Sequence, residues 1–162
     1  MAEQALEEIP NKDLKEILKH RSLKTLIHKP KGRAFFEIYL KDPENAHIEF
    51  LKYWNFLNTV DLIKNLEDVD QKLDYSDDCY KKHIAIEADC EHSIIGLINR
   101  AKVREIDKAL KNHRQDRSDP TDSFSELAVL AFDYLDEKIF IPNLLRVLLE
   151  EKEQRISNCL IT

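Results

Sequence analysis

The segment Gly32-Arg-Ala-Phe-Phe-Glu-Ile-Tyr-Leu40 shows which fold class this chain adopts. Its large apolar residues recur at helical spacing, so four of them share one face of a predicted helix: Phe35, Phe36, Tyr39 and Leu40. The whole chain of 162 residues has only two glycines and five prolines, and the prolines lie at the edges of apolar segments. A sheet protein of this size needs more turn glycines, so the sequence predicts an all-α fold with negligible strand.

Helical spacing continues upstream of this segment. Asn11 is a candidate N-cap for a helix with Leu14, Ile17 and Leu18 on one face. Ser22 is a candidate cap for a short helix that Pro30 ends.

Downstream, the pair Asp42-Pro43 predicts an N-cap followed by proline at the first position of a long helix. Weaker helical spacing covers residues 61–75, and Ser76 is a candidate cap for the next helix. Residues 113–122 form the clearest predicted loop, and two further helices are predicted at residues 123–136 and 142–156. The sequence therefore predicts about eight or nine short helices.

The aromatic side chains between residues 35 and 56 are predicted to be core residues, with an aromatic box for a ligand as the alternative. The series comprises Phe35, Phe36, Tyr39, Phe50, Tyr53, Trp54 and Phe56.

Composition narrows the classes of function. The chain is 43% hydrophobic and 35% charged, which is typical of a solvated globular protein. Its net charge of −6 argues against a nucleic-acid partner, whose binding domain is usually basic. Residues 12–33 are nevertheless rich in lysine and arginine. That basic segment is either a solvated helix face or a contact with a membrane surface.

No catalytic or metal-binding constellation is visible. The six histidines have no metal-ligand spacing with each other or with cysteine, so no metal and no cofactor are expected. Two glycines cannot build a nucleotide-binding loop, and the chain is not expected to be an enzyme. Cys79, Cys90 and Cys159 form no paired framework, which predicts reduced thiols and a cytoplasmic location. No apolar run approaches the length of a membrane span.

The last four residues, Cys159-Leu-Ile-Thr162, fit the C-a-a-X pattern of a prenylated cysteine. Lipidation of Cys159 would place the protein at a membrane. The alternative is a tail cysteine without this role.

Five fragments in order resemble a regulator of G-protein signalling (RGS) domain over about residues 22–149. They are residues 22–40, 48–51, 80–88, 104–110 and 124–144. The resemblance implies two packed helical subdomains, one built from the chain ends and one a four-helix bundle. Residues 1–21 are then a basic amphipathic extension, and residues 150–162 are the end of the last helix and a tail.

The resemblance also implies a partner, the α-subunit of a heterotrimeric G protein (Gα). RGS domains that accelerate GTP hydrolysis supply no catalytic group, because they bind and order the catalytic segments of Gα. Carried onto this chain, the partner-binding residues are Glu44, Asn45, His47, Asn99 and Ser125. For Asn45 and His47, the alternative is a solvated side chain with no partner role.

Several positions depart from the family pattern. Ala46 and His47 stand where the family has Glu-Asn, Ser125 replaces an aspartate, and Leu130 occupies the place of an arginine. RGS-like domains that depart in similar ways serve as interaction modules. The resemblance therefore implies a Gα-binding module, with or without stimulation of GTP hydrolysis. The alternatives are an RGS-fold scaffold without this activity and a peripheral membrane adaptor.

Overall fold

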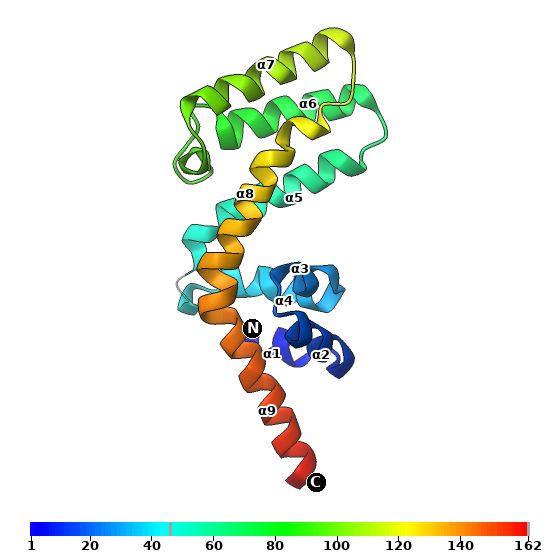
Figure 1. Ribbon diagram of the computed structural model, residues 1–162, viewed down its shortest axis with the longest axis vertical. Helices are drawn as coiled ribbons and strands as arrows, with labels where there is room; N and C mark the ends of the chain where they lie inside the picture. The colour runs from blue at the N-terminus through cyan, green and yellow to red at the C-terminus, as the bar shows by residue number, and fades with distance from the viewer. Residues whose placement is uncertain (46, 162) are drawn as a thin grey trace. The chain divides into compact units, whose positions relative to one another are not determined.

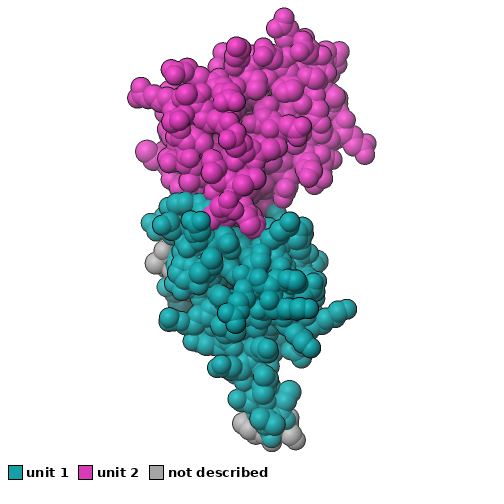
Figure 2. Space-filling view, viewed as in Figure 1, with its two compact units in different colours: residues 1–51, 134–162 teal, residues 52–133 magenta. Residues whose placement is uncertain are grey.

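The computed structural model describes residues 1–45 and 47–161, with the side chains of Asn45, Ile48 and Ile161 left outside the description. These residues form helices and contain no strand, which confirms the predicted all-α fold (Figure 1). They divide into two compact units (Figure 2). The first unit comprises residues 1–51 and 134–162, and the second comprises residues 52–133. The predicted boundaries after residues 21 and 149 stay predictions.

The first unit is built from the two ends of the chain. Its helices are α1 (Ala2–Glu7), α2 (Asn11–His20), α3 (Leu23–His28), α4 (Pro30–Lys41) and α9 (Leu145–Ile161). The core between them consists of fully buried side chains that include Ile17, Leu23, Leu26, Phe35, Phe36, Leu40, Phe140 and Leu148. Residues 1–21 thus supply part of this core through α1 and α2.

Close packing of α3 against α4 depends on Gly32. A Cβ atom at this position would lie 2.3 Å from the carbonyl oxygen of Leu26. Because that oxygen belongs to the backbone, any larger residue would force the two helices apart.

The hydroxyl of Ser22 accepts a hydrogen bond from the backbone N–H of Lys24 at 3.1 Å, so the predicted cap of α3 is confirmed.

Arg155 joins the C-terminal helix to the N-terminal one. Its guanidinium donates to the backbone carbonyls of Leu6 at 2.9 Å and Ile9 at 2.7 Å. The Leu6 oxygen belongs to the last turn of α1 and also accepts from the backbone N–H of Ile9 at 3.2 Å, so Arg155 supplies a further donor at this helix end. Glu151, one turn earlier on α9, accepts from the Arg155 Nε at 2.9 Å and orients the group.

The second unit is continuous in sequence. It contains α5 (Leu51–Asn65), α6 (Val69–Cys79), α7 (Arg100–Asp116) and most of α8 (Ser125–Leu135), with Leu51 itself in the first unit. A π-helical turn follows α6 at Tyr80–Ile84, and 3-10 turns precede α7 and α8 at Ile95–Leu97 and Thr121–Phe124. Phe56 lies at the centre, edge-on to Phe124 with ring centroids 6.3 Å apart.

The aromatic series is mainly core, as predicted. Six of its seven members are buried, whereas Phe50 is half-buried.

Two predicted caps are wrong. Asn11 is the first residue of α2, and Pro10 precedes it at the cap position. The Asn11 side chain instead accepts a hydrogen bond from Arg155 at 2.8 Å. Ser76 lies inside α6 and is fully buried, because that helix begins earlier than predicted and is capped by Asp68. The Asp68 carboxylate accepts from the backbone N–H of Asp70 at 3.2 Å.

Three predicted helix boundaries are also wrong. Asp42 does cap a helical turn that begins with Pro43, because its carboxylate accepts from the Glu44 backbone N–H at 3.0 Å, but this turn is the short 3-10 segment Pro43–Asn45 and the long helix starts only at Leu51. The predicted loop at residues 113–122 is partly helical, because α7 continues to Asp116 and ends where Arg117 is left-handed, with φ of 51°. Pro142 lies inside a π-helical segment, Asp136–Leu144, which leads into α9. Because proline has no N–H and clashes with the carbonyl four residues earlier, it does not fit a regular α-helix, and the chain is π-helical there.

Candidate functional site

Two of the predicted partner-binding residues, Asn99 and Ser125, stand at the starts of helices in the second unit. Asn99 is the N-cap of α7, and its side-chain oxygen accepts a hydrogen bond from the backbone N–H of Lys102 at 2.9 Å. Ser125 is the first residue of α8. Both side chains are exposed. Asn99 therefore has a structural role that leaves its amide group accessible to a partner.

A surface pocket of about 520 Å³ lies between the start of α7 and the first turns of α8. Residues 96–99 form one wall, and Leu130 and Glu126 contribute from α8. The pocket brings Asn99 and Leu130 together, whereas Ser125 is next to it in sequence without lining it. The pocket thus joins one predicted partner-binding residue, Asn99, to Leu130, which stands where the family pattern has an arginine.

Lys102 and Glu126 form an ion pair in this pocket, and the sequence interpretation missed both residues. The Lys102 ammonium also lies 3.4 Å from the Glu105 carboxylate. The hydrogen bond with Glu126 is the main reason why the pKa of Lys102 is raised above its ordinary value. Helical spacing suggests the Lys102–Glu105 pair, but nothing in the sequence links Lys102 to a residue 24 positions away.

The pocket also exposes apolar surface. Leu130 is 39% exposed, and its neighbour Val129 is 59% exposed. Leu130 is therefore not a core residue. An apolar side chain stands at the surface where the family pattern has a guanidinium group.

The other predicted partner residues, Glu44, Asn45 and His47, belong to the first unit. Glu44 is exposed in the 3-10 turn, where its backbone N–H donates to the Asp42 carboxylate at 3.0 Å. His47 is half-buried, and its ring stacks on Tyr39 with centroids 5.3 Å apart. This burial lowers the pKa of His47 below its usual value, which favours the neutral imidazole at neutral pH.

Some of these predicted positions cannot be placed. Ala46 lies outside the described residues, as does the Asn45 side chain, so the predicted role of Asn45 stays a prediction.

The His47 ring contacts Tyr39, and its centroid lies 6.3 Å from the centroid of the Phe50 ring. A partner would therefore meet His47 as part of an aromatic group rather than as a solvated side chain.

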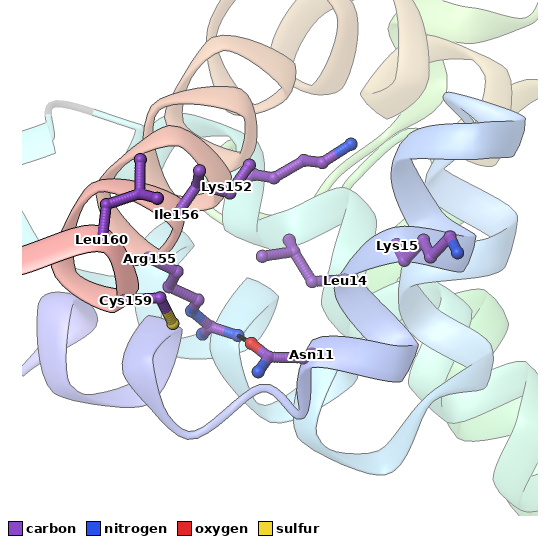
Figure 3. A pocket seen from close by; sticks show the side chains of 8 residues that line it. All are labelled: Asn11, Leu14, Lys15, Lys152, Arg155, Ile156, Cys159 and Leu160. Carbon is purple, nitrogen blue, oxygen red and sulfur yellow. Dashed lines mark hydrogen bonds between the residues drawn. The ribbon is translucent and has the colours of Figure 1, made fainter. Parts of the chain in front are cut away.

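The predicted lipidation site, Cys159, is exposed near the end of α9. It lines a pocket of about 360 Å³ between α2 and α9 (Figure 3). The final residue of the C-a-a-X pattern, Thr162, lies outside the described residues, and lipidation stays a prediction.

Over residues 1–45 and 47–161, no group of three or more histidine, cysteine, aspartate or glutamate side chains is placed to hold a metal ion. None of the helices in the same ranges is long and apolar enough to span a bilayer.

Comparisons with protein families, with characterised proteins and with solved structures gave no match for this chain. The RGS resemblance therefore depends on the residues quoted above.

Proposed function

We propose that this chain is an RGS-like regulatory module that binds a Gα subunit. The observation that carries the proposal is the pocket that joins Asn99 to Leu130. The resemblance assigns both positions to the partner surface, although 31 residues of sequence separate them. Their meeting at one exposed pocket is what such a surface requires.

The division of the chain supports the same proposal. An RGS-like domain combines a subdomain from the chain ends with a helical bundle from the middle. Here residues 1–51 and 134–162 form one unit, and residues 52–133 form the other. The middle unit contains α5, α6, α7 and most of α8, in the order that the resemblance implies.

The module would act on Gα by ordering its catalytic segments, since phosphoryl transfer depends mainly on positioning and electrostatics. The polar groups for this task are reduced here. Ser125 carries no carboxylate, and Leu130 offers an apolar surface to the partner. A polar group at an interface contributes about 1–3 kcal/mol, so we expect binding to be weaker by about tenfold or more for each such group that this chain lacks.

The test is single-turnover GTP hydrolysis by a panel of Gα subunits, together with binding to Gα in its transition-state form with GDP and aluminium fluoride. The double variant Ser125→Asp with Leu130→Arg should bind this form at least tenfold more tightly. Both side chains are exposed, so the variant is expected to fold.

A matched control places the same groups elsewhere. Ile86 is 58% exposed and Ser157 is exposed on α9, so Ile86→Arg with Ser157→Asp makes the same chemical changes away from the pocket. This control should leave Gα binding unchanged. A folded Ser125→Asp and Leu130→Arg variant that binds no better, with no acceleration of hydrolysis by the wild type, would contradict the proposal.

The exposed apolar pair Val129 and Leu130 favours a second candidate, an RGS-fold scaffold that binds another protein without affecting GTP hydrolysis. The scaffold is distinguished by a partner whose binding does not depend on the nucleotide state of any Gα.

A further inference from the structure

A groove between α2 and α9 has an apolar floor and an open mouth. Leu14 contributes from α2, while Ile156 and Leu160 contribute from α9 (Figure 3). Ile156 is 52% exposed and Leu160 is 84% exposed. The two side chains lie one helical turn apart and so form a continuous apolar strip at the surface. Such a strip at the edge of a pocket is typical of an interaction surface.

Lysines flank one side of this groove. Lys15 and Lys152 line it from opposite helices, and their chains extend to the side away from Cys159 (Figure 3). Lys12 and Lys19 share the exposed face of α2 with Lys15, because their spacing is three and four residues. None of these four lysines forms an ion pair with any carboxylate among the described residues.

Arg155 holds the groove in place but is not available to a ligand. Its donors are occupied by Glu151, Asn11 and the backbone carbonyls at the end of α1. The groove is thus a fixed feature of the first unit, and the lysines supply its accessible positive charge.

We propose that this groove docks the protein on a membrane surface that carries anionic lipids. Ile156 and Leu160 enter the boundary between headgroups and acyl chains, and the four lysines contact the headgroups. An amphipathic helix binds membranes through this combination of apolar insertion and electrostatic attraction. The surface is independent of the proposed Gα pocket, since it lies wholly on α2 and α9.

The charges favour an anionic membrane over a second copy of the chain as the partner of this groove. A symmetric dimer through the same groove would bring the lysines of one copy against those of the other, and like charges oppose that pairing. Anionic headgroups complement them. Two acidic neighbours should weaken the contact: Glu153 on the exposed flank of α9, and Glu16 on α2, which pairs with Lys29 at 2.7 Å.

The experiment is sedimentation of the full, unlipidated chain with vesicles of phosphatidylcholine, with or without phosphatidylserine. We expect binding only when phosphatidylserine is present, and weaker binding as salt is added. A lysine near an anionic surface contributes about fivefold to partitioning, so Lys15→Glu with Lys152→Glu should reduce binding by roughly 25-fold or more. Glu153→Lys should increase vesicle binding.

Matched variants test each part of the proposal. Lys108→Glu with Lys138→Glu makes the same charge change at exposed sites away from the groove, and it should retain most of the binding. Ile156→Ser with Leu160→Ser should abolish vesicle binding. Ile86→Ser with Leu62→Ser removes exposed apolar groups elsewhere and should leave vesicle binding unchanged.

Three results would overturn the inference. The first is equal binding to neutral and anionic vesicles. The second is an equal loss of vesicle binding in Lys15→Glu with Lys152→Glu and in Lys108→Glu with Lys138→Glu. The third is self-association by sedimentation equilibrium that Ile156→Ser abolishes while vesicle binding is absent, which would assign the groove to a second copy. Gα binding should not change in the groove variants, so failure here is distinguishable from failure of the proposed function.

Discussion

The two units of this protein are stabilised in different ways. The first, from residues 1–51 and 134–162, is held by contacts between distant segments, such as the hydrogen bond from Arg155 to the Ile9 carbonyl across 146 residues. The second, from residues 52–133, is continuous and carries exposed ion pairs such as Arg117 with Asp70 at 2.8 Å. Exposed pairs contribute little to stability, whereas buried and tightly packed groups contribute much. Substitutions that break the Arg155 network of the first unit should therefore have larger effects than substitutions in the exposed pairs of the second.

The largest effect is expected for Arg155→Ala. The change leaves Glu151 buried without its partner and the Ile9 carbonyl without its Arg155 donor, whereas the Leu6 carbonyl keeps the backbone N–H of Ile9. We expect a loss of about 3 kcal/mol in the free energy of unfolding, measured by urea denaturation. Amide hydrogen exchange should increase mainly in the first unit.

Arg146→Ala is the control for this prediction, because Arg146 is an exposed arginine on the same helix. It should change stability by less than about 0.5 kcal/mol. Equal effects of the two variants would contradict the role assigned to Arg155.

The two glycines provide the next test. Gly32→Ala places a Cβ 2.3 Å from a backbone oxygen, so it should destabilise the chain by about 1–3 kcal/mol. Gly96→Ala places a Cβ where no atom lies within 4 Å, and it should be neutral or stabilise by about 0.5 kcal/mol. Thermal unfolding of both variants measures the difference. The reverse order would break the comparison between the units.

A smaller, pH-dependent effect is expected for Asp119 in the second unit. Hydrogen bonds from Thr121 and from the largely buried Lys72 lower the pKa of Asp119 to about 2. A carboxylate with a lowered pKa stabilises the fold above its ordinary pKa, and this contribution is lost as the pH falls from about 4 to about 2.

Asp119→Asn should therefore cost about 1 kcal/mol at pH 7, a figure reduced because the side chain is 54% exposed. Unfolding measured at pH 7 and pH 2 tests this prediction. A cost that does not shrink at the lower pH would show that the charge is not its origin.

The smallest effect on stability is expected for Lys102→Met. Its carboxylate partners, Glu105 and Glu126, are each 69% exposed, so the change should alter the free energy of unfolding least among these variants. Chemical denaturation checks this ranking, with Lys111→Met as the control for an exposed pair within one helix. A decrease as large as that expected for Arg155→Ala would mean that the second unit also depends on its surface pairs.

Periodicity alone determined the fold class, because the spacing of Leu14, Ile17 and Leu18, or of Phe35 and Phe36, is a local property of the chain. The Ser22 cap was predictable for the same reason, because its hydrogen bond joins residues only two positions apart in the sequence. The helix boundaries around Pro43, Ser76 and Pro142 were not predictable from the sequence. Helix ends depend on competing caps and on packing, which local patterns describe poorly.

The candidate site shows the same limit. The family resemblance selected Asn99 and marked Leu130 as a departure from the family pattern, but only the fold brought the two to one pocket and showed that Leu130 is exposed. The pairing of Lys102 with Glu126, and of Arg155 with the carbonyls of α1, was decided by tertiary structure. Such contacts join residues whose separation along the chain carries no periodic signal. The sequence therefore determined the helical class and most of the apolar faces, and the tertiary structure decided which side chains meet and which stay exposed.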